Sequence, residues 1–122
     1  FVLEQSQEFS KEALNEHQRT LRMRGRPKIK LARNYEEAVR IFDQYRDNIL
    51  GIISDMSFMH EGVKDPYAGY KFGQYVRKTG LIIPFVLESS ESSNKVYAEE
   101  LNASFIDKNS VKEPVRICSV LP

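Results

Sequence analysis

The sequence predicts an α/β domain in which helices cover both faces of a mostly parallel sheet. Two segments, 49–54 and 81–88, are almost continuously apolar, which is typical of strands buried on both faces. Segments with helical spacing of apolar residues lie around them, and strands that alternate with helices form crossover units. A length of 122 residues fits a single domain with one core.

The first half of the chain is expected to begin with a long amphipathic helix. Residues 1–24 contain no Gly or Pro and repeat apolar residues at mostly helical intervals, and Gly25 and Pro27 then end the helix. The elements expected next are a strand, a helix with Asn34 as its N-cap, and the first buried strand, at 28–32, 34–48 and 49–54.

The second half is expected to start with a long loop that turns at Asp65 and Pro66. The loop covers 59–69 and is followed by a helix at 70–80 and the second buried strand at 81–88. A short helix at 92–102 and a strand at 103–107 are expected after it. The segment VRICSV, 115–120, lacks helical periodicity and is predicted to be a strand.

The composition argues against several classes of partner. With 18 basic and 17 acidic residues the net charge is +1, so the protein has no strong overall electrostatic potential that would attract nucleic acid or a membrane surface. The basic cluster at 19–30 has no interleaved aromatic residues to stack on bases. One cysteine, Cys118, excludes an intrachain disulfide, and the absence of a long apolar run predicts a cytoplasmic protein. The missing initiator Met indicates a processed product or a fragment of a larger protein.

Polar residues follow the buried strands where chemistry is expected. In parallel sheets, ligands bind at the carboxyl ends of the strands. Asp55 follows the strand 49–54, Ser89 follows 81–88, and Lys108 follows the last strand. Because burying an ionised carboxylate without a partner is costly, we expect Lys108 to lie within ion-pair distance of Asp55.

An acid, a hydroxyl and a lysine at three successive strand ends resemble the receiver domain of two-component response regulators. The resemblance covers about residues 28 to 110, through ARNYEEAV, GIISD, PFVLESS and NASFIDK. LNEHQRTLRMRGRPKI and IDKNS are more narrowly similar to receiver modules attached to phosphoenolpyruvate synthase-like proteins. The resemblance implies one receiver-like domain over 1–122 with a flavodoxin-like parallel sheet.

The resemblance also implies a role for each site residue. Asp55 would accept a phosphoryl group from a histidine kinase and bind Mg²⁺, with the backbone carbonyl of Ser57 as a second metal ligand. Ser89 would bond a phosphoryl oxygen, Lys108 would pair with the acid and then the phosphoryl group, and Phe105 would be the switch aromatic. Phosphoryl transfer depends mainly on positioning and charge neutralisation, which these groups would supply.

Each of these residues also has a purely structural interpretation. In this interpretation Asp55 simply ends a strand, and Phe105 belongs to the core. Ser89 and Ser90 would cap the next helix. Lys108 alone would be a solvated loop lysine. The two histidines have no metal-ligand spacing, so a zinc site is not expected.

The sequence departs from the family where the metal would bind. The family's first strand, which carries a pair of acids and lies at the sheet centre, is not visible, and FVLEQ with Glu4 is a poor substitute. Asn109 stands where the family usually has proline. We therefore expect an incomplete Mg²⁺ site, and a sheet centre filled either by 115–120 or by an element of a second copy.

Two functions follow from these observations. The first is a phospho-acceptor receiver, regulatory rather than enzymatic, that is phosphorylated on Asp55 by a histidine kinase and controls an attached or separate output domain. The second is a degenerate receiver-like module that acts in protein interaction or dimerisation without phosphotransfer. An acid pair beside Asp55 would distinguish them. Neither function requires nucleic acid or a membrane as partner.

Overall fold

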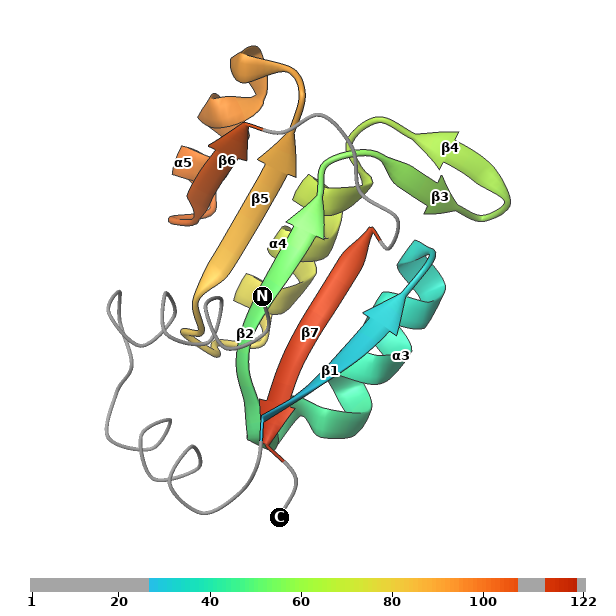
Figure 1. Ribbon diagram of the computed structural model, residues 1–122, viewed down its shortest axis with the longest axis vertical. Helices are drawn as coiled ribbons and strands as arrows, with labels where there is room; N and C mark the ends of the chain where they lie inside the picture. Colours follow the sequence, from blue (N-terminus) through green and yellow to red (C-terminus); the bar gives the residue numbers. More distant parts are fainter. Residues whose placement is uncertain (1–26, 108–113, 121–122) are drawn as a thin grey trace.

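The computed structural model describes residues 27–107 and 114–120, and the predicted helix 1–24 lies outside them. The described residues form a five-stranded sheet, a separate hairpin and three α-helices (Figure 1). In spatial order the strands of the sheet are β1 (Pro27–Ala32), β7 (Val115–Val120), β2 (Ile49–Asp55), β5 (Phe85–Ser89) and β6 (Ser104–Asp107).

The sheet is mixed, so the prediction of a flavodoxin-like parallel sheet is wrong. Strands β2, β5 and β6 are parallel, but β7 runs antiparallel to both of its neighbours, β1 and β2. The prediction that 115–120 is a strand is confirmed, and this strand is an interior strand of the sheet, between β1 and β2.

The direction of β7 follows from the length of the connection before it. Only residues 108–114 lie between the end of β6 and the start of β7. A parallel return needs a crossover of a dozen residues or more, whereas a short connection brings the chain back from the edge at which β6 ends. The chain therefore enters β7 beside the carboxyl ends of β2 and β5 and runs back between β1 and β2.

The three described α-helices pack on one face of the sheet, not on both as predicted. They are α3 (Tyr35–Tyr45), α4 (Ala68–Lys78) and α5 (Lys95–Glu100), and they lie behind the sheet in Figure 1. Their buried side chains join one core cluster with the strands, centred on the edge-to-face rings of Phe42 and Phe72. A smaller cluster, Leu50, Ile53 and Cys118, belongs to the opposite face of the sheet.

Helix α3 begins as the sequence predicts. The side chain of Asn34 accepts a hydrogen bond from the backbone N–H of Glu37 at 2.8 Å, which confirms the N-cap. The helix buries Ala38, Ile41 and Phe42, whose spacing places them on one face. It ends at Tyr45 rather than 48, because a 3₁₀ turn, Arg46–Asn48, leads into β2.

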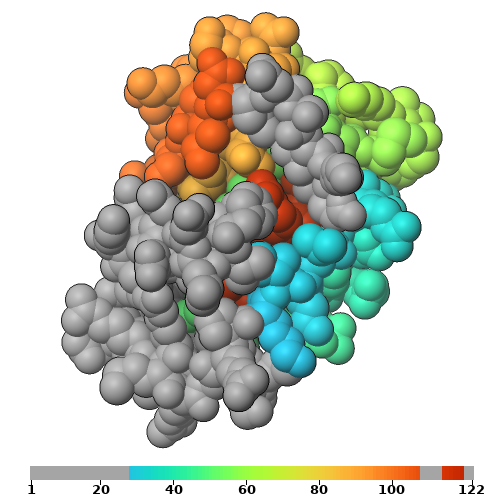
Figure 2. Space-filling view, viewed as in Figure 1, coloured from blue at the N-terminus to red at the C-terminus, as the bar shows by residue number. Residues whose placement is uncertain are grey.

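The segment predicted as a long loop contains a β-hairpin. Its strands are β3 (Phe58–His60) and β4 (Val63–Asp65), and Figure 2 shows it in yellow-green, projecting from one corner of the molecule. Glu61 and Gly62 form the turn with φ of 54° and 77°. Two successive left-handed residues, the second of them glycine, match the two-residue turn that suits the twist of a hairpin.

Helix α4 begins two residues earlier than predicted and ends two residues earlier, whereas β5, α5 and β6 are shorter than predicted. Strand β5 begins at Phe85 rather than at 81, and a 3₁₀ turn, Ser92–Asn94, precedes α5. Within residues 27–107 and 114–120, no helix has both the length and the apolar character needed to cross a membrane.

Candidate functional site

Asp55 ends β2 at the edge where the parallel strands finish, as the sequence predicts. Its Cα pairs with that of Glu88 on β5, and its backbone N–H donates to the carbonyl of Pro114 at 2.6 Å. One carboxylate oxygen accepts from the N–H of Met56 at 3.0 Å. The residue is partly buried. It is therefore held between the end of β5 and the segment that leads into β7.

Ser89 lies at the same edge, and its hydroxyl is hydrogen-bonded within the turn that follows β5. Its hydroxyl oxygen accepts from the backbone N–H of Glu91 at 3.0 Å and from the side-chain amide of Asn94 at 2.9 Å. These bonds fix the turn before α5. The N-cap residue of α5 is Asn94, so the interpretation of Ser89 as the cap of that helix is wrong. Ser89 is 4 % exposed, so its hydroxyl is largely inaccessible to a ligand from solvent.

Strand alternation places Asp55 and Ser89 on opposite faces of the sheet. Ser89 lies two residues after Leu87, which belongs to the helix-covered core, and Asp55 lies two residues after Ile53, which belongs to the opposite cluster. Successive side chains of a strand point to opposite faces. The two residues thus share a sheet edge, but their side chains leave it in different directions.

The other predicted site residues are only partly placed. Phe105 lies on β6 beside Leu87 and is half-buried against the main core, on the same face as Ser89. Ser57 lies between β2 and β3. Lys108 lies outside the described residues, so its contact with Asp55 stays a prediction.

An ion pair crosses β2 near the strand end that carries Asp55. Arg116 on β7 lies beside Ile53 of β2 in the strand register, and its guanidinium donates to Glu88 on β5 at 2.5 Å. The pair thus spans β2 on the face to which alternation assigns Asp55. Both side chains are largely buried, with exposed fractions of 13 % and 11 %. The sheet centre therefore carries a cation next to Asp55.

The residues around Asp55 that the structure describes do not fit a Mg²⁺ ion. The ion prefers several hard oxygen ligands in near-octahedral geometry. Glu88, the nearest acid in register, is engaged by Arg116. Among residues 27–107 and 114–120, no three His, Cys, Asp or Glu side chains are grouped so as to hold a metal.

The start of α4 packs directly on the backbone that follows Asp55. The N–H of Gly69 donates to the carbonyl of Met56 at 2.8 Å. A Cβ atom at Gly69 would lie 2.0 Å from the carbonyl oxygen of Asp55. Glycine is therefore required here, because only a residue without a side chain lets α4 approach the end of β2 so closely.

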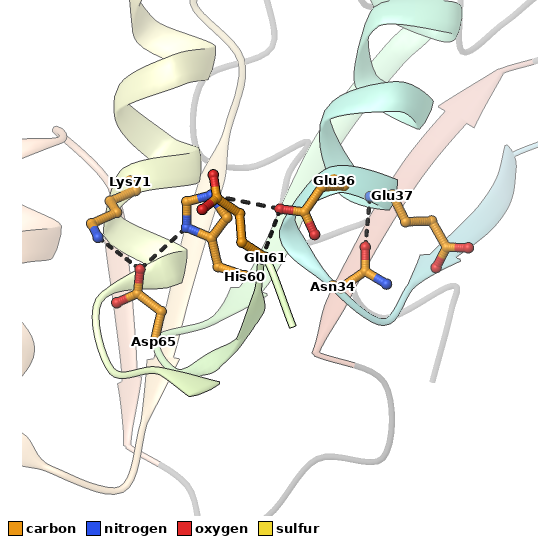
Figure 3. A network of polar contacts seen from close by, with 7 residues as sticks. All are labelled: Asn34, Glu36, Glu37, His60, Glu61, Asp65 and Lys71. Carbon is orange, nitrogen blue, oxygen red and sulfur yellow. Dashed lines mark hydrogen bonds and ion pairs between the residues drawn. The ribbon is translucent and has the colours of Figure 1, made fainter. Parts of the chain in front are cut away.

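A second polar cluster, which the sequence did not predict, joins the hairpin to two helices. We call Glu36, His60, Asp65 and Lys71 the hairpin cluster (Figure 3). His60 lies 3.6 Å from Glu36 on α3 and 3.3 Å from Asp65 on β4, and the ammonium of Lys71 on α4 lies 2.7 Å from the same Asp65 oxygen. Four residues from three separate segments thus meet at one place, which spacing along the sequence could not reveal.

The hairpin cluster keeps Asp65 ionised. The hydrogen bond from Lys71 lowers the pKa of Asp65 below 3.8, and bonds from the backbone of Tyr67 and the side chain of His60 act in the same direction, against the raising effect of burial. A lowered folded-state pKa means that this carboxylate stabilises the fold above its unfolded-state pKa. The contribution is lost as the pH falls through the folded-state value.

We expect Lys71→Met to raise the pKa of Asp65 and to destabilise the fold at pH 7 by about 0.5 kcal/mol, since the pair is partly solvated. The difference between the two proteins should shrink as the pH falls through the lowered pKa of Asp65, where its carboxylate takes up a proton. Carboxyl NMR titration and urea unfolding measure these two effects. Lys64→Met, at an exposed lysine of the same hairpin, is the matched control. An equal loss in both variants would contradict the assignment.

A shallow pocket of about 320 Å³ lies between α4 and α5. Arg77 lines it, and its guanidinium donates to the backbone carbonyls of Leu101, Ile83 and Asn102 at 2.9, 2.7 and 3.3 Å. Burial lowers the pKa of Arg77. The guanidinium thus joins α4 to the segment that leads into β5 and to the residues that follow α5. None of the predicted site residues lines this pocket.

Comparison with protein-family models, with curated proteins and with solved structures finds no match for this chain.

Proposed function

We propose that this chain is a degenerate receiver-like module that regulates a partner or attached output domain through protein contacts, without phosphoryl transfer and without catalysis of its own. The observation that carries the proposal is the Arg116–Glu88 ion pair at the sheet centre. A phospho-acceptor site needs negative charge beside the acceptor to bind a metal, and here the neighbouring acid is already neutralised by a cation.

The strand order supports the receiver-like part of the proposal. Strands β1, β2, β5 and β6 follow one another across the sheet in the order of the sequence. Strand β7 lies between β1 and β2, where the acid-bearing first strand of a receiver would be inserted. Replacing that strand by VRICSV keeps the central strands hydrogen-bonded but supplies no carboxylate. The change preserves a folded domain while removing groups that phosphotransfer chemistry needs.

The bonds at Asp55 and Ser89 support the same function. The backbone and carboxylate of Asp55 are tied into the strand end, and the hydroxyl of Ser89 serves the turn before α5. Residues that satisfy local backbone groups in this way contribute to the fold whether or not a phosphoryl group ever arrives.

A phospho-acceptor receiver, modified on Asp55 by a histidine kinase, is the second candidate. One observation favours it: Asp55 and Ser89 end neighbouring parallel strands at the same edge, where ligands of parallel sheets bind. Lys108 would then complete the site. The two candidates differ in whether Asp55 takes up a phosphoryl group.

We expect the chain, incubated with Mg²⁺ and acetyl phosphate, to incorporate no more phosphate than its Asp55→Asn variant. Phosphate-affinity electrophoresis measures the incorporation. Tyrosine fluorescence measures Mg²⁺ binding, because the chain has six tyrosines and no tryptophan. Phosphorylation that depends on Asp55, or tight Mg²⁺ binding that Asp55→Asn abolishes, would overturn the proposal in favour of the second candidate.

A further inference from the structure

One imidazole links the β3–β4 hairpin to α3. Nε2 of His60 lies 3.6 Å from Oε2 of Glu36 on α3, and Nδ1 lies 3.3 Å from Oδ2 of Asp65 on the partner strand (Figure 3). The side chain is 24 % exposed, so it is mostly shielded from water. Both ring nitrogens therefore face a carboxylate oxygen.

Only the protonated ring satisfies both contacts. A neutral imidazole has one N–H, so it can donate to one carboxylate while the lone pair of its other nitrogen faces the second negative charge. The imidazolium has an N–H on each nitrogen and a positive charge, so it can donate to Asp65 at 3.3 Å while its charge attracts Glu36 across the 3.6 Å ion-pair distance. The geometry is complementary to His60 in its charged form.

The groups around the ring maintain this arrangement from three elements. From α3, the ring of Tyr35 stacks on His60 with centroids 4.1 Å apart. From the hairpin turn, the backbone N–H of Glu61 donates to the same Glu36 oxygen at 3.1 Å. From α4, Lys71 holds Asp65 at 2.7 Å and opposes part of the charge on the imidazolium. Two carboxylates and one more distant ammonium thus act on the ring.

We propose that His60 is a pH-dependent clamp, which holds the turn of the β3–β4 hairpin against α3 more tightly when the ring is protonated than when the ring is neutral. This inference rests on the geometry of the hairpin cluster and does not depend on the proposed function. Histidine is the side chain that ordinarily changes charge between about pH 5 and 8. Loosening would change the position of Val63, which is 68 % exposed beside the turn.

The backbone amide of Glu61 is a direct reporter of the clamp, because it bonds to the Glu36 oxygen that the ring also contacts. Amide hydrogen exchange is measured by NMR and expressed as a protection factor, which removes the intrinsic effect of pH. We expect the protection of Glu61 to be several-fold higher at about pH 5.5 than at about pH 7.5. The amide of Glu37, which donates to Asn34 at 2.8 Å, is the reference and should not change.

Three variants test the mechanism. His60→Gln should abolish the pH dependence at Glu61, and Glu36→Gln should reduce it, since it removes one of the two carboxylates that face the ring. Glu37→Gln, the adjacent acid on α3, is the matched control and should leave it intact. His17→Gln is introduced throughout so that only one imidazole titrates. Protection at Glu61 that does not depend on pH, or that changes equally in His60→Gln, would overturn the proposal.

Discussion

Replacing Gly69 with alanine is expected to destabilise the protein by about 3 kcal/mol, the upper part of the range for overpacked sites. The new methyl carbon would lie 2.0 Å from the carbonyl oxygen of Asp55 and 2.9 Å from two further backbone atoms, of Asp55 and Met56. Backbone atoms at the end of a buried strand cannot rotate away as a side chain can. Helix α4 must therefore move off β2, which breaks its hydrogen bond to Met56.

Urea unfolding followed by circular dichroism measures the effect, and Gly73→Ala is the matched control. Gly73 lies on the same helix, but its added Cβ would meet the Cδ1 atom of Leu101 at 2.4 Å, which is the end of a flexible side chain. Both variants gain the same helix propensity from alanine. We expect Gly73→Ala to destabilise by about 1 kcal/mol or less. Equal losses would show that α4 does not approach β2 as closely as described.

Removing Arg116 is expected to have an effect of similar size. Arg116→Ala leaves the carboxylate of Glu88, whose side chain is 11 % exposed, without its cation. A charge left in such a place destabilises by about 3 kcal/mol. The double variant Arg116→Met with Glu88→Gln removes both charges together and should recover most of the loss, because the pair stabilises little relative to neutral groups of similar size.

The comparison is again made by urea unfolding, with an exposed arginine as control. Arg40 lies 3.9 Å from Glu37, and its side chain is 64 % exposed. Arg40→Ala should change the free energy of unfolding by about 0.5 kcal/mol or less. If Arg116→Ala had no larger effect than Arg40→Ala, or if the double variant were as unstable as the single one, the ion pair would not be a buried element of the sheet centre.

Strands could be located from the sequence, but their directions could not. The apolar run at 49–54 and the segment 115–120 both form the strands that their patterns predict. A strand pattern reads the same in either direction, so VRICSV carries no information on its orientation. The orientation is fixed by the seven residues 108–114 that precede it, too few for a crossover. Weighing the length of that connection would have predicted the mixed sheet.

Of the candidate site, the sequence predicted only which residues lie at the ends of strands. The sequence placed Asp55 and Ser89 at strand ends, and the structure agrees. It did not reveal that their side chains leave opposite faces, because continuously apolar runs show no alternation, and the register that pairs Asp55 with Glu88 rather than Ser89 is set only in the folded sheet. The hairpin was missed because strands of three residues are too short to show periodicity. The pair Glu61-Gly62 was its one local signal.

The position of β7 between β1 and β2 has a consequence for how the protein is made. Synthesis runs from the N-terminus, so β1, β2, β5 and β6 all leave the ribosome before the strand that pairs with both β1 and β2. Until Val120 has emerged, the inner edges of β1 and β2 have no strand between them and expose backbone groups that readily pair with other chains. We therefore expect the nascent chain to complete this sheet only late in translation, and to depend on chaperones during that interval more than a domain whose central strand is made first.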